Sequence, residues 1–327
     1  MNRTGFTTTI PLEILLAADR IPVDLNNLFI TGGKGLELVE QAEASGFPRN
    51  TCSWIKGIYS AAMESGLREM VAVTEGDCSN TRALMEVLSY SGIRVVPFAY
   101  PHDRNAAALR AEIEKLMAAF GVGWDEVRHA SERLEAIREK IRTLDRLTWE
   151  EDLVSGEENH YFQVASSDMN GSPDSYDAEI DRFISEVRSR TPYRDRIRLA
   201  YIGVPPILEG LYPFLEFHGA RVVFNETQRQ FSMPYGIGDL VERYRAYTYP
   251  YDIFFRLADI EKELERRRVD GVIHYVQSFC FRQIEDIIVR RRLHLPILTL
   301  EGDKPGPLDA RTAIRIESFL ELIGETR

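Results

Sequence analysis

Short apolar, β-rich runs alternate with amphipathic helical patterns along almost the whole chain, and this alternation limits the fold more than any other feature. The runs that read as strands lie at 28–31, 70–74, 94–98, 197–202, 221–224, 272–276 and 297–300. Helical patterns lie between them, for example at 80–90, and a last helix is expected at about 308–322. Such alternation is typical of βαβ units around a parallel sheet.

A purely helical segment separates the two halves of the chain. Between about 103 and 147 one apolar stripe recurs at spacings of three and four, formed by Val127, Ala130, Leu134, Ile137, Ile141 and Leu144. Residues 150–175 are rich in acidic residues, glycine and serine, which predicts a solvated linker. A chain of 327 residues is also too long for one ordinary core.

We therefore expect an α/β protein with two doubly wound, Rossmann-like (flavodoxin-like) domains that are joined by the helical segment. The N-terminal domain is expected at 1–150. The linker and the C-terminal domain are expected at 151–327. In open parallel sheets, ligands bind at the carboxyl ends of the strands, so a site is expected in the cleft between the domains.

Charge and hydropathy exclude several classes of protein. The net charge of −11 argues against a nucleic-acid binder, which must neutralise phosphates. No window approaches the ~18 apolar residues of a membrane span, and the N-terminus lacks the basic start of a secretory signal. These observations predict a cytoplasmic protein that binds no membrane. The arginine triplets at 266–268 and 290–292 are expected to complement the dipoles of helix ends.

All three cysteines lie at similar junctions between a loop and a helix. Cys78 and Cys280 follow predicted strands, and Cys52 lies in a loop expected at the same edge of the first sheet. Two cysteines of one domain and one of the other should therefore meet in the cleft. A helix N-terminus lowers the pKa of a thiol, so each junction is expected to favour a thiolate.

Three kinds of site compete for these cysteines. A buried cysteine is most often a small apolar side chain, but none of the three lies on a core-facing strand or stripe. Structural zinc sites use closely spaced pairs, whereas 25 and 201 residues separate successive cysteines here. A thiolate-bound iron–sulfur cluster tolerates wide spacing if the fold brings its ligands together. Spacing alone leaves these alternatives open.

An ordered set of segments resembles one family along nearly the whole chain. The set is GFTTTIPLEILLAADRIPVDL, the Cys52 loop, EGDC, HASERLEAIREKIRTL, DGVIHYVQSFC, LPILTLEGD and ARTAIRIESFLE. The chain resembles the subunits of 2-hydroxyacyl-CoA dehydratases and benzoyl-CoA reductases, and among them the 2-hydroxyglutaryl-CoA dehydratase D-component. The resemblance implies that Cys52, Cys78 and Cys280 hold a [4Fe–4S] cluster. Since a cubane has four irons, one iron is then not ligated by cysteine.

The resemblance also implies a radical-type enzyme that acts on an acyl-CoA thioester, either as a dehydratase (a lyase) or as a reductase. Low-potential electrons would come from an ATP-hydrolysing iron–sulfur activator. The partner subunit would be a homologue or a second copy of the chain. Two alternatives stay open: a stand-alone [4Fe–4S] small-molecule reductase or electron-transfer protein, and a non-enzymatic metal-binding scaffold.

Polar residues at predicted strand ends are the candidates for proton handling or for the neighbourhood of the fourth iron. They are Glu75, Asp77, Gln277 and Ser278, with Asn80 and Glu301 close by. His274, inside an apolar strand, reads as a hydrogen-bonded core histidine. The TGGKG run at 31–35 lacks the spacing of a phosphate loop and is expected to form a tight turn from strand to helix.

Overall fold

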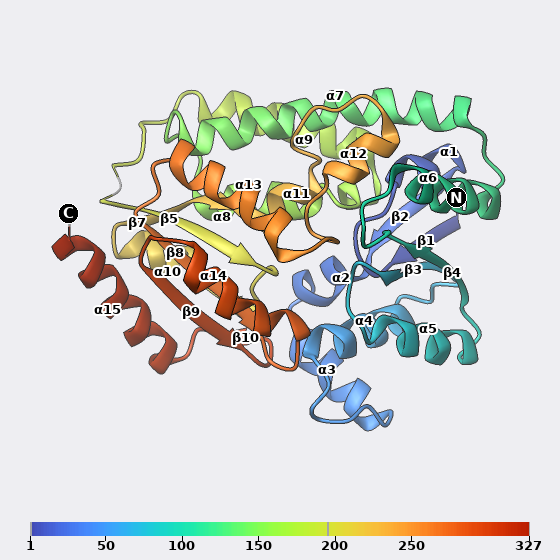
Figure 1. Ribbon diagram of the computed structural model, residues 1–327, viewed down its shortest axis with the longest axis horizontal. Helices are drawn as coiled ribbons and strands as arrows, with labels where there is room; N and C mark the ends of the chain where they lie inside the picture. Colours follow the sequence, from blue (N-terminus) through green and yellow to red (C-terminus); the bar gives the residue numbers. More distant parts are fainter. Residues whose placement is uncertain (1, 195, 327) are drawn as a thin grey trace.

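The computed structural model describes residues 2–194 and 196–326 and places two parallel sheets side by side (Figure 1). The first sheet has the order β2-β1-β3-β4 and the second the order β7-β5-β8-β9, with every pairing parallel. The strands of the first sheet are β1 (Asn2–Phe6), β2 (Arg20–Asp24), β3 (Glu69–Glu75) and β4 (Arg94–Ala99). Those of the second are β5 (Ile197–Gly203), β7 (Ala220–Asn225), β8 (Gly271–Gln277) and β9 (Ile297–Gly302). A short parallel pair is formed by β6 (Leu208–Glu209) and β10 (Gly306–Pro307).

Helices cover both faces of each sheet. Those of the first half are α1 (Leu12–Ala17), α2 (Leu25–Thr31), α3 (Gly35–Ala44), α4 (Ser53–Glu64), α5 (Thr81–Tyr90), α6 (Ala106–Phe120) and α7 (Trp124–Trp149). Those of the second half are α8 (Gly156–Ala165), η1 (Met169–Gly171), α9 (Pro173–Val187), α10 (Leu211–Phe217), α11 (Glu226–Phe231), α12 (Leu240–Ala246), α13 (Ile253–Arg266), η2 (Phe281–Glu285), α14 (Asp286–Arg292) and α15 (Ala310–Thr326). No helix in the described part of the chain is long and apolar enough to cross a membrane.

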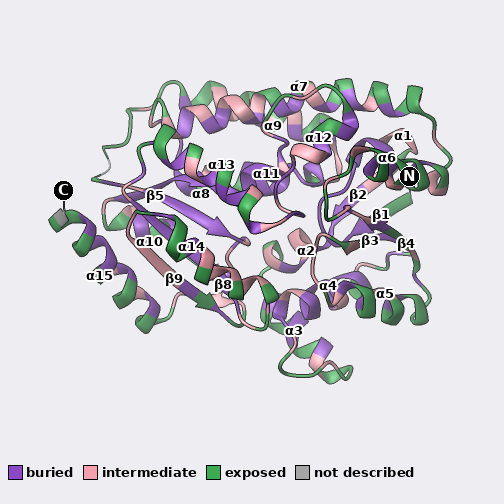
Figure 2. Ribbon diagram, viewed as in Figure 1, coloured by how far each residue is buried: buried purple, intermediate pink, exposed green. Residues whose placement is uncertain are grey.

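Separate apolar cores lie on the two faces of each sheet, as expected for doubly wound domains. On the first sheet, one core contains Phe6 and Phe98 together with the inner faces of α6, α7 and α9, and the other contains Met70 with α4 and α5. On the second sheet, one core joins Tyr201 to α10 and α15, and the other joins Val223 to α13. The strands β5, β7 and β8 are almost wholly buried (Figure 2). The predicted fold class is confirmed.

The division of the chain at about residue 150 stays a prediction. Segments from beyond that position return to the first sheet: Tyr176 and Ile180 of α9 and Tyr244 of α12 belong to its core. Conversely, Phe29 of α2 and Val39 of α3 pack with the core of the second sheet. The two sheets therefore share packed walls.

Two expectations about the first half are wrong. Residues 28–31 form the end of α2 rather than a strand, because the Asp24 side chain accepts a hydrogen bond from the Asn26 amide and caps the helix. The TGGKG run consequently connects two helices, α2 and α3, instead of a strand and a helix. The strands β1 and β2 were not predicted, since NRTGF and RIPVD mix charged residues, glycine and proline within five residues.

The expected solvated linker is also wrong, because α8 occupies much of it and is largely buried. Its Ser155 and Glu158 form a capping box. Asn159, from the polar run GEEN, and Gln163 are fully buried and donate hydrogen bonds to Asp145 Oδ1 at 3.0 and 3.1 Å. Polar residues inside the fold thus produced a misleading sequence pattern.

The predicted helical segment is confirmed, and its second helix, α7, runs along both sheets (Figure 1). Of its apolar stripe, all members except Ala130 are buried. Buried ion pairs attach α7 on both sides. Arg138 Nη1 lies 2.7 Å from Glu13 Oε1 on α1, and Asp145 Oδ2 lies 2.5 Å from Arg267 Nη2 at the end of α13.

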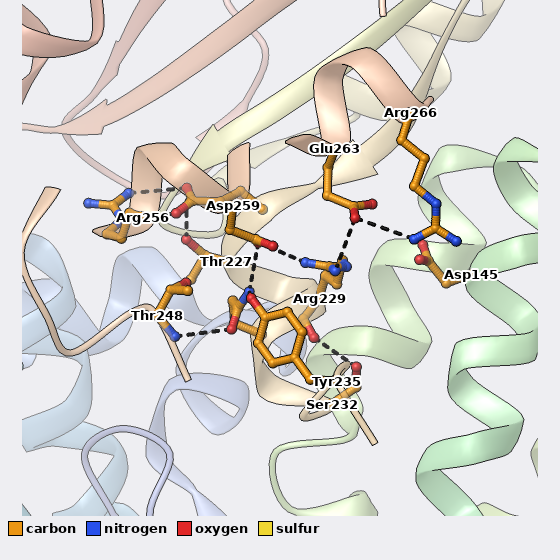
Figure 3. Close-up of polar contacts among 12 residues, drawn as sticks. Asp145, Thr227, Arg229, Ser232, Tyr235, Thr248, Arg256, Asp259, Glu263 and Arg266 are labelled. Atoms are coloured by element: carbon orange, nitrogen blue, oxygen red, sulfur yellow. Dashed lines mark hydrogen bonds and ion pairs between the residues drawn. The ribbon is translucent and has the colours of Figure 1, made fainter. Parts of the chain in front are cut away.

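The second of these pairs belongs to an extended buried network. Arg267 Nε also lies 2.8 Å from Glu263 Oε2, and Arg229 Nη1 lies 2.8 Å from Asp259 Oδ2. Figure 3 shows Arg229 between Asp259 and Glu263, with Asp145 and Arg266 beside them. Arg266 is half-exposed, whereas Arg267 is buried, because carboxylates of α7 and α13 compensate its charge. Both lie at the end of α13, and their interaction with the helix dipole stays a prediction.

Candidate functional site

The three cysteines line one cavity of about 760 Å³ at the carboxyl edges of both sheets. Cys52 is the N-cap residue of α4, Cys78 lies between β3 and α5, and Cys280 follows β8 as the N-cap residue of η2. Cys52 is buried, and Cys78 and Cys280 are half-buried. The structure therefore brings together thiols from both halves of the chain, as expected from the strand-end rule.

The remaining walls of the cavity come from the ends of other strands and from neighbouring helices. Thr7, Thr8 and Thr9 follow β1, and Asp24 ends β2. Val204 and Pro205 follow β5. The helical walls are formed by Asn26, Asn27 and Ile30 of α2, Trp54, Ile55 and Ile58 of α4, Val164 of α8 and Phe231 of α11. The cavity thus combines apolar walls with a few polar side chains, as small-molecule and cofactor sites do.

The backbone before Cys78 can be formed only by glycine. Gly76 has φ = +91°, which L side chains rarely adopt. A Cβ at this position would lie 2.8 Å from Pro250 Cβ and 2.9 Å from Tyr100 Cβ. Because Gly76 has no side chain, the chain can turn sharply after β3 against these neighbours. Asp77 and Cys78, which follow the turn, line the cavity.

The backbone before Cys280 is strained. Phe279 has φ = +64°, which is rare for a bulky residue, and its side chain is exposed, so no apolar burial explains the conformation. Strain of this kind costs roughly 1–3 kcal/mol and is common at functional sites. The Cys280 amide donates to Gln277 O at 3.0 Å and closes the turn that aims the thiol at the other two.

The expectation that the helix ends lower the thiol pKa values is wrong for the free thiols. Burial raises the pKa of both Cys52 and Cys78 to about 12, and it raises the pKa of Cys280 as well. The amides of Trp54 and Ile55 at the start of α4 lower the pKa of Cys52, but desolvation outweighs them. A bound metal would reverse this balance, since a coordinating thiol is deprotonated.

The donor set fits a cluster better than a single ion. Within residues 2–194 and 196–326, no three His, Cys, Asp or Glu side chains are grouped closely enough for one metal ion. The three cysteines instead line one cavity together. Trp54 also lines the cavity, and its Nε1 is buried without a hydrogen-bond partner in the described part of the chain. A polynuclear group with bridging acceptors fits these features.

Two of the four predicted polar residues lie in the cavity and two do not. Asp77 and Gln277 line it. Glu75 is exposed and accepts a hydrogen bond from the His102 amide at 3.3 Å, and Ser278 donates to Glu301 Oε1 at 2.9 Å. Their proposed roles in proton handling remain predictions.

Asp77 and Gln277 differ in how their polar atoms are engaged. Burial raises the pKa of Asp77 to about 7, although the nearby Arg282 lowers it, and the Tyr249 hydroxyl lies 3.5 Å from its Oδ1. Gln277 accepts from the Tyr275 hydroxyl at 3.0 Å and donates to Asp303 O at 2.8 Å. The amide of Gln277 is thus fixed in orientation by two short hydrogen bonds, whereas the carboxyl group of Asp77 is contacted by the Tyr249 hydroxyl at the longer distance and by the Cys78 backbone.

Sequence reasoning missed the threonine run 7–9 and the acidic pair beneath it, because it missed β1 and β2. Asp24 accepts a hydrogen bond from Ser167 at 2.6 Å, and its amide donates to Asp168 Oδ2 at 2.9 Å. Burial, and then the charge of Asp24, raises the pKa of Asp168 to about 7. Three consecutive threonines after a short strand were the available signal. His274, by contrast, is confirmed as a buried histidine, with Nδ1 at 2.7 Å from Asp286 Oδ1.

A second, larger cavity of about 1240 Å³ adjoins the first and shares Asn27, Ile30 and Val164 with it. It is bordered by α8, by the turn that contains β6, and by Pro305 before β10. The second cavity is open to solvent, and the site therefore consists of an inner space at the thiols and an outer space that borders it at these three residues.

Comparison with known proteins agrees with this geometry. The sequence model of the 2-hydroxyglutaryl-CoA dehydratase D-component family matches residues 7–323, nearly the whole chain. No curated protein sequence matches the chain. The chain belongs to the 2-hydroxyglutaryl-CoA dehydratase D-component family, and it is therefore a component of the 2-hydroxyacyl-CoA dehydratase type.

Proposed function

We propose that the chain is the iron–sulfur subunit of a radical enzyme that acts on a CoA thioester. Cys52, Cys78 and Cys280 are the proposed ligands of a [4Fe–4S] cluster. The observation that carries the proposal is their convergence: thiols separated by 25 and 201 residues line one cavity between two sheets. Membership of a dehydratase-component family supports 2-hydroxyacyl-CoA dehydration as the reaction, ahead of acyl-CoA reduction.

A cluster in this cavity would supply low-potential electron transfer and, at the iron without a cysteine ligand, a Lewis-acidic position. The protein's own contribution is to orient substrate and to exclude water. The apolar walls formed by Ile55, Ile58 and Phe231 limit access of water to the inner space. Asp77 is the proposed proton-handling group, because its carboxyl group lies in the same cavity as the thiols.

Partners follow from the same proposal. Electron delivery is assigned to a separate ATP-hydrolysing iron–sulfur activator, and assembly to a pair of similar subunits, formed with a homologue or with a second copy of this chain. Light scattering of freshly purified protein tests the assembly. A dimer is expected, and a strict monomer in the presence of candidate homologous subunits would contradict this part.

Iron and sulfide analysis of anaerobically purified protein tests the ligand assignment. We expect roughly four irons and four sulfides per chain. Replacement of any one of Cys52, Cys78 or Cys280 with alanine should remove or convert the cluster. Ser278→Ala is a matched control, because Ser278 lies in the same turn as Cys280 but outside the cavity lining. Unchanged cluster content in all three cysteine variants would overturn the assignment.

The same preparation tests the reaction class. Addition of 2-hydroxyacyl-CoA thioesters should perturb the electron paramagnetic resonance spectrum of the reduced protein, whereas free CoA should not. If the cluster is present but no thioester perturbs it, even with activator and partner, dehydration is the wrong assignment. The small-molecule reductase or electron-transfer function then replaces it.

A further inference from the structure

The second cavity has a charge pattern that is unusual for a nucleotide site. None of the described residues that line it is a lysine or an arginine, whereas Glu157 and Glu209 both line it. Phosphate groups that entered this space would meet carboxylates and no compensating cation. Its other walls are apolar or neutral, and they include Ile207, Leu211 and Pro305. This lining suits an uncharged chain.

His160 supplies a fixed polar group in this wall. Its Nδ1 lies 3.1 Å from the Tyr212 hydroxyl and 3.3 Å from Gln228 Nε2, and its ring packs on that of Tyr212 with 4.8 Å between centroids. Tyr212 is itself held by a hydrogen bond to Asn225 Oδ1 at 2.7 Å. The orientation of the imidazole is therefore determined from the Nδ1 side. Among the described residues, Nε2 has no hydrogen-bond partner.

The imidazole is also neutral at physiological pH, because burial lowers the pKa of His160 to about 4. A neutral ring forms hydrogen bonds with an amide or a hydroxyl group but does not attract an anion. Tyr161 and Asn170, which line the same cavity, add further uncharged hydrogen-bonding groups. The fixed orientation of the His160 ring and its lack of charge thus both favour an uncharged ligand that carries hydrogen-bonding groups.

We propose that the second cavity binds an uncharged, amide-bearing chain and that His160 Nε2 hydrogen-bonds to one of its polar groups. In the thioester substrate of the proposed function, on which this identification rests, the chain is the pantetheine arm. Its sulfur end then points through the shared wall of Asn27, Ile30 and Val164 toward the cysteines.

The same charge pattern places the phosphates of such a thioester outside the cavity. Two exposed lysines flank its rim: Lys34 precedes the lining residue Gly35, and Lys304 precedes the lining residue Pro305. Gly35 and Pro305 touch, since a Cβ on Gly35 would lie 2.9 Å from Pro305 Cβ. The two lysines are therefore carried by adjoining segments beside the cavity. Lys304 Nζ lies 3.9 Å from Glu43 Oε1, so a phosphate would compete with that carboxylate for it.

Anaerobic calorimetry on the iron-loaded protein tests the proposal with two probes. S-Methylpantetheine carries the amide arm without acyl group or phosphates, and 2-hydroxyglutaryl-CoA carries all three. His160→Ala should weaken both probes by the same factor, about 3- to 10-fold for one neutral hydrogen bond. In His160→Gln the side-chain amide can replace the hydrogen bond of the imidazole, so part of the affinity that is lost in His160→Ala should return. His129→Ala, an exposed histidine on α7, is the matched control and should change nothing.

Substitution of the two lysines tests the position of the phosphates separately from that of the pantetheine arm. The double substitution Lys34→Glu and Lys304→Glu should weaken only 2-hydroxyglutaryl-CoA. The proposal is overturned if His160→Ala, with unchanged iron content and circular dichroism, binds S-methylpantetheine like the wild type, or if the wild type binds the CoA thioester but not S-methylpantetheine. If S-methylpantetheine binds in a His160-dependent way while no CoA thioester perturbs the cluster, the cavity assignment holds and the proposed reaction fails.

Discussion

Replacement of Arg267 with methionine should destabilise the protein severely, although no residue of the site is changed. The guanidinium group of Arg267 is buried and makes four polar contacts, with Asp145 at 2.9 and 2.5 Å, Glu263 at 2.8 Å and Val223 O at 2.7 Å. Methionine keeps much of the apolar packing against Trp149 but removes the charge and all five N–H donors.

The size of the loss in unfolding free energy depends on the contacts that Asp145 and Glu263 keep in the variant. Asp145 keeps the neutral donors of Asn159 and Gln163, and it loses its directly bonded cation, while Arg229 still interacts with it electrostatically. Removal of one partner of a buried ion pair typically costs about 3–5 kcal/mol. Glu263 retains Arg229 at 3.4 Å, so the lower half of that range is expected. With an unfolding entropy of about 2.1 cal/mol/K per residue over 327 residues, 3–4 kcal/mol lowers Tm by about 4–6 °C.

Urea unfolding followed by circular dichroism measures this loss, and Arg266→Met is the matched control. Arg266 occupies the same helix end but is 47% exposed and contacts Glu263 only at 3.4 Å, so its replacement should cost less than about 1 kcal/mol. In the Arg267→Met background, Asp145→Asn should cost less than it does alone, because the carboxylate has already lost its partner. Equal effects of the two arginine substitutions would refute the reasoning.

Two further variants test the turn at Cys78 and the acidic pair below the cavity. Gly76→Ala should lose more stability and more iron than Gly92→Ala in denaturation and iron assays. Both glycines have positive φ, but of the two only Gly76 has neighbours, Pro250 among them, within 3 Å of a Cβ. Equal losses in the two variants would contradict this. Folded Asp168 has its pKa raised to about 7, so the folded state binds more protons than the unfolded state and stability should fall as pH rises from about 4 to 7. Asp168→Asn should reduce this slope by at most ~1.4 kcal/mol per pH unit and leave the part that comes from Asp77, whose pKa is also raised to about 7. An unchanged slope in urea titrations would exclude Asp168 as a source.

The sequence predicted the parts of the fold whose pattern is local and periodic. The stripe of α7 and the apolar runs of β5, β8 and β9 identify their elements because burial on regular faces requires apolar side chains at fixed spacing. The strands β1 and β2 carry too few apolar residues to be recognised. The helix α8 was missed because it begins with the polar run GEEN, whose Asn159 is buried and satisfied by Asp145 inside the protein.

The candidate site was predictable in topology but not in electrostatics. The position of Cys78 and Cys280 after strands was sufficient to predict that their thiols meet, because parallel strands end at a common edge. Whether burial or the helix end controls a thiol pKa depends on how deeply the chain covers it, which no local pattern encodes. The role of His160 depends on Tyr212 and Gln228, which are 52 and 68 residues away in sequence.

Mössbauer spectroscopy of the anaerobically prepared protein, enriched in ⁵⁷Fe, tests the central claim most directly. Three cysteines in one cavity predict a [4Fe–4S] spectrum in which one iron in four differs from the other three, since it alone lacks a thiolate ligand. Addition of 2-hydroxyglutaryl-CoA should shift that one iron and leave the others unchanged. A spectrum without a four-iron cluster, or one in which all four irons stay equivalent, would contradict the account.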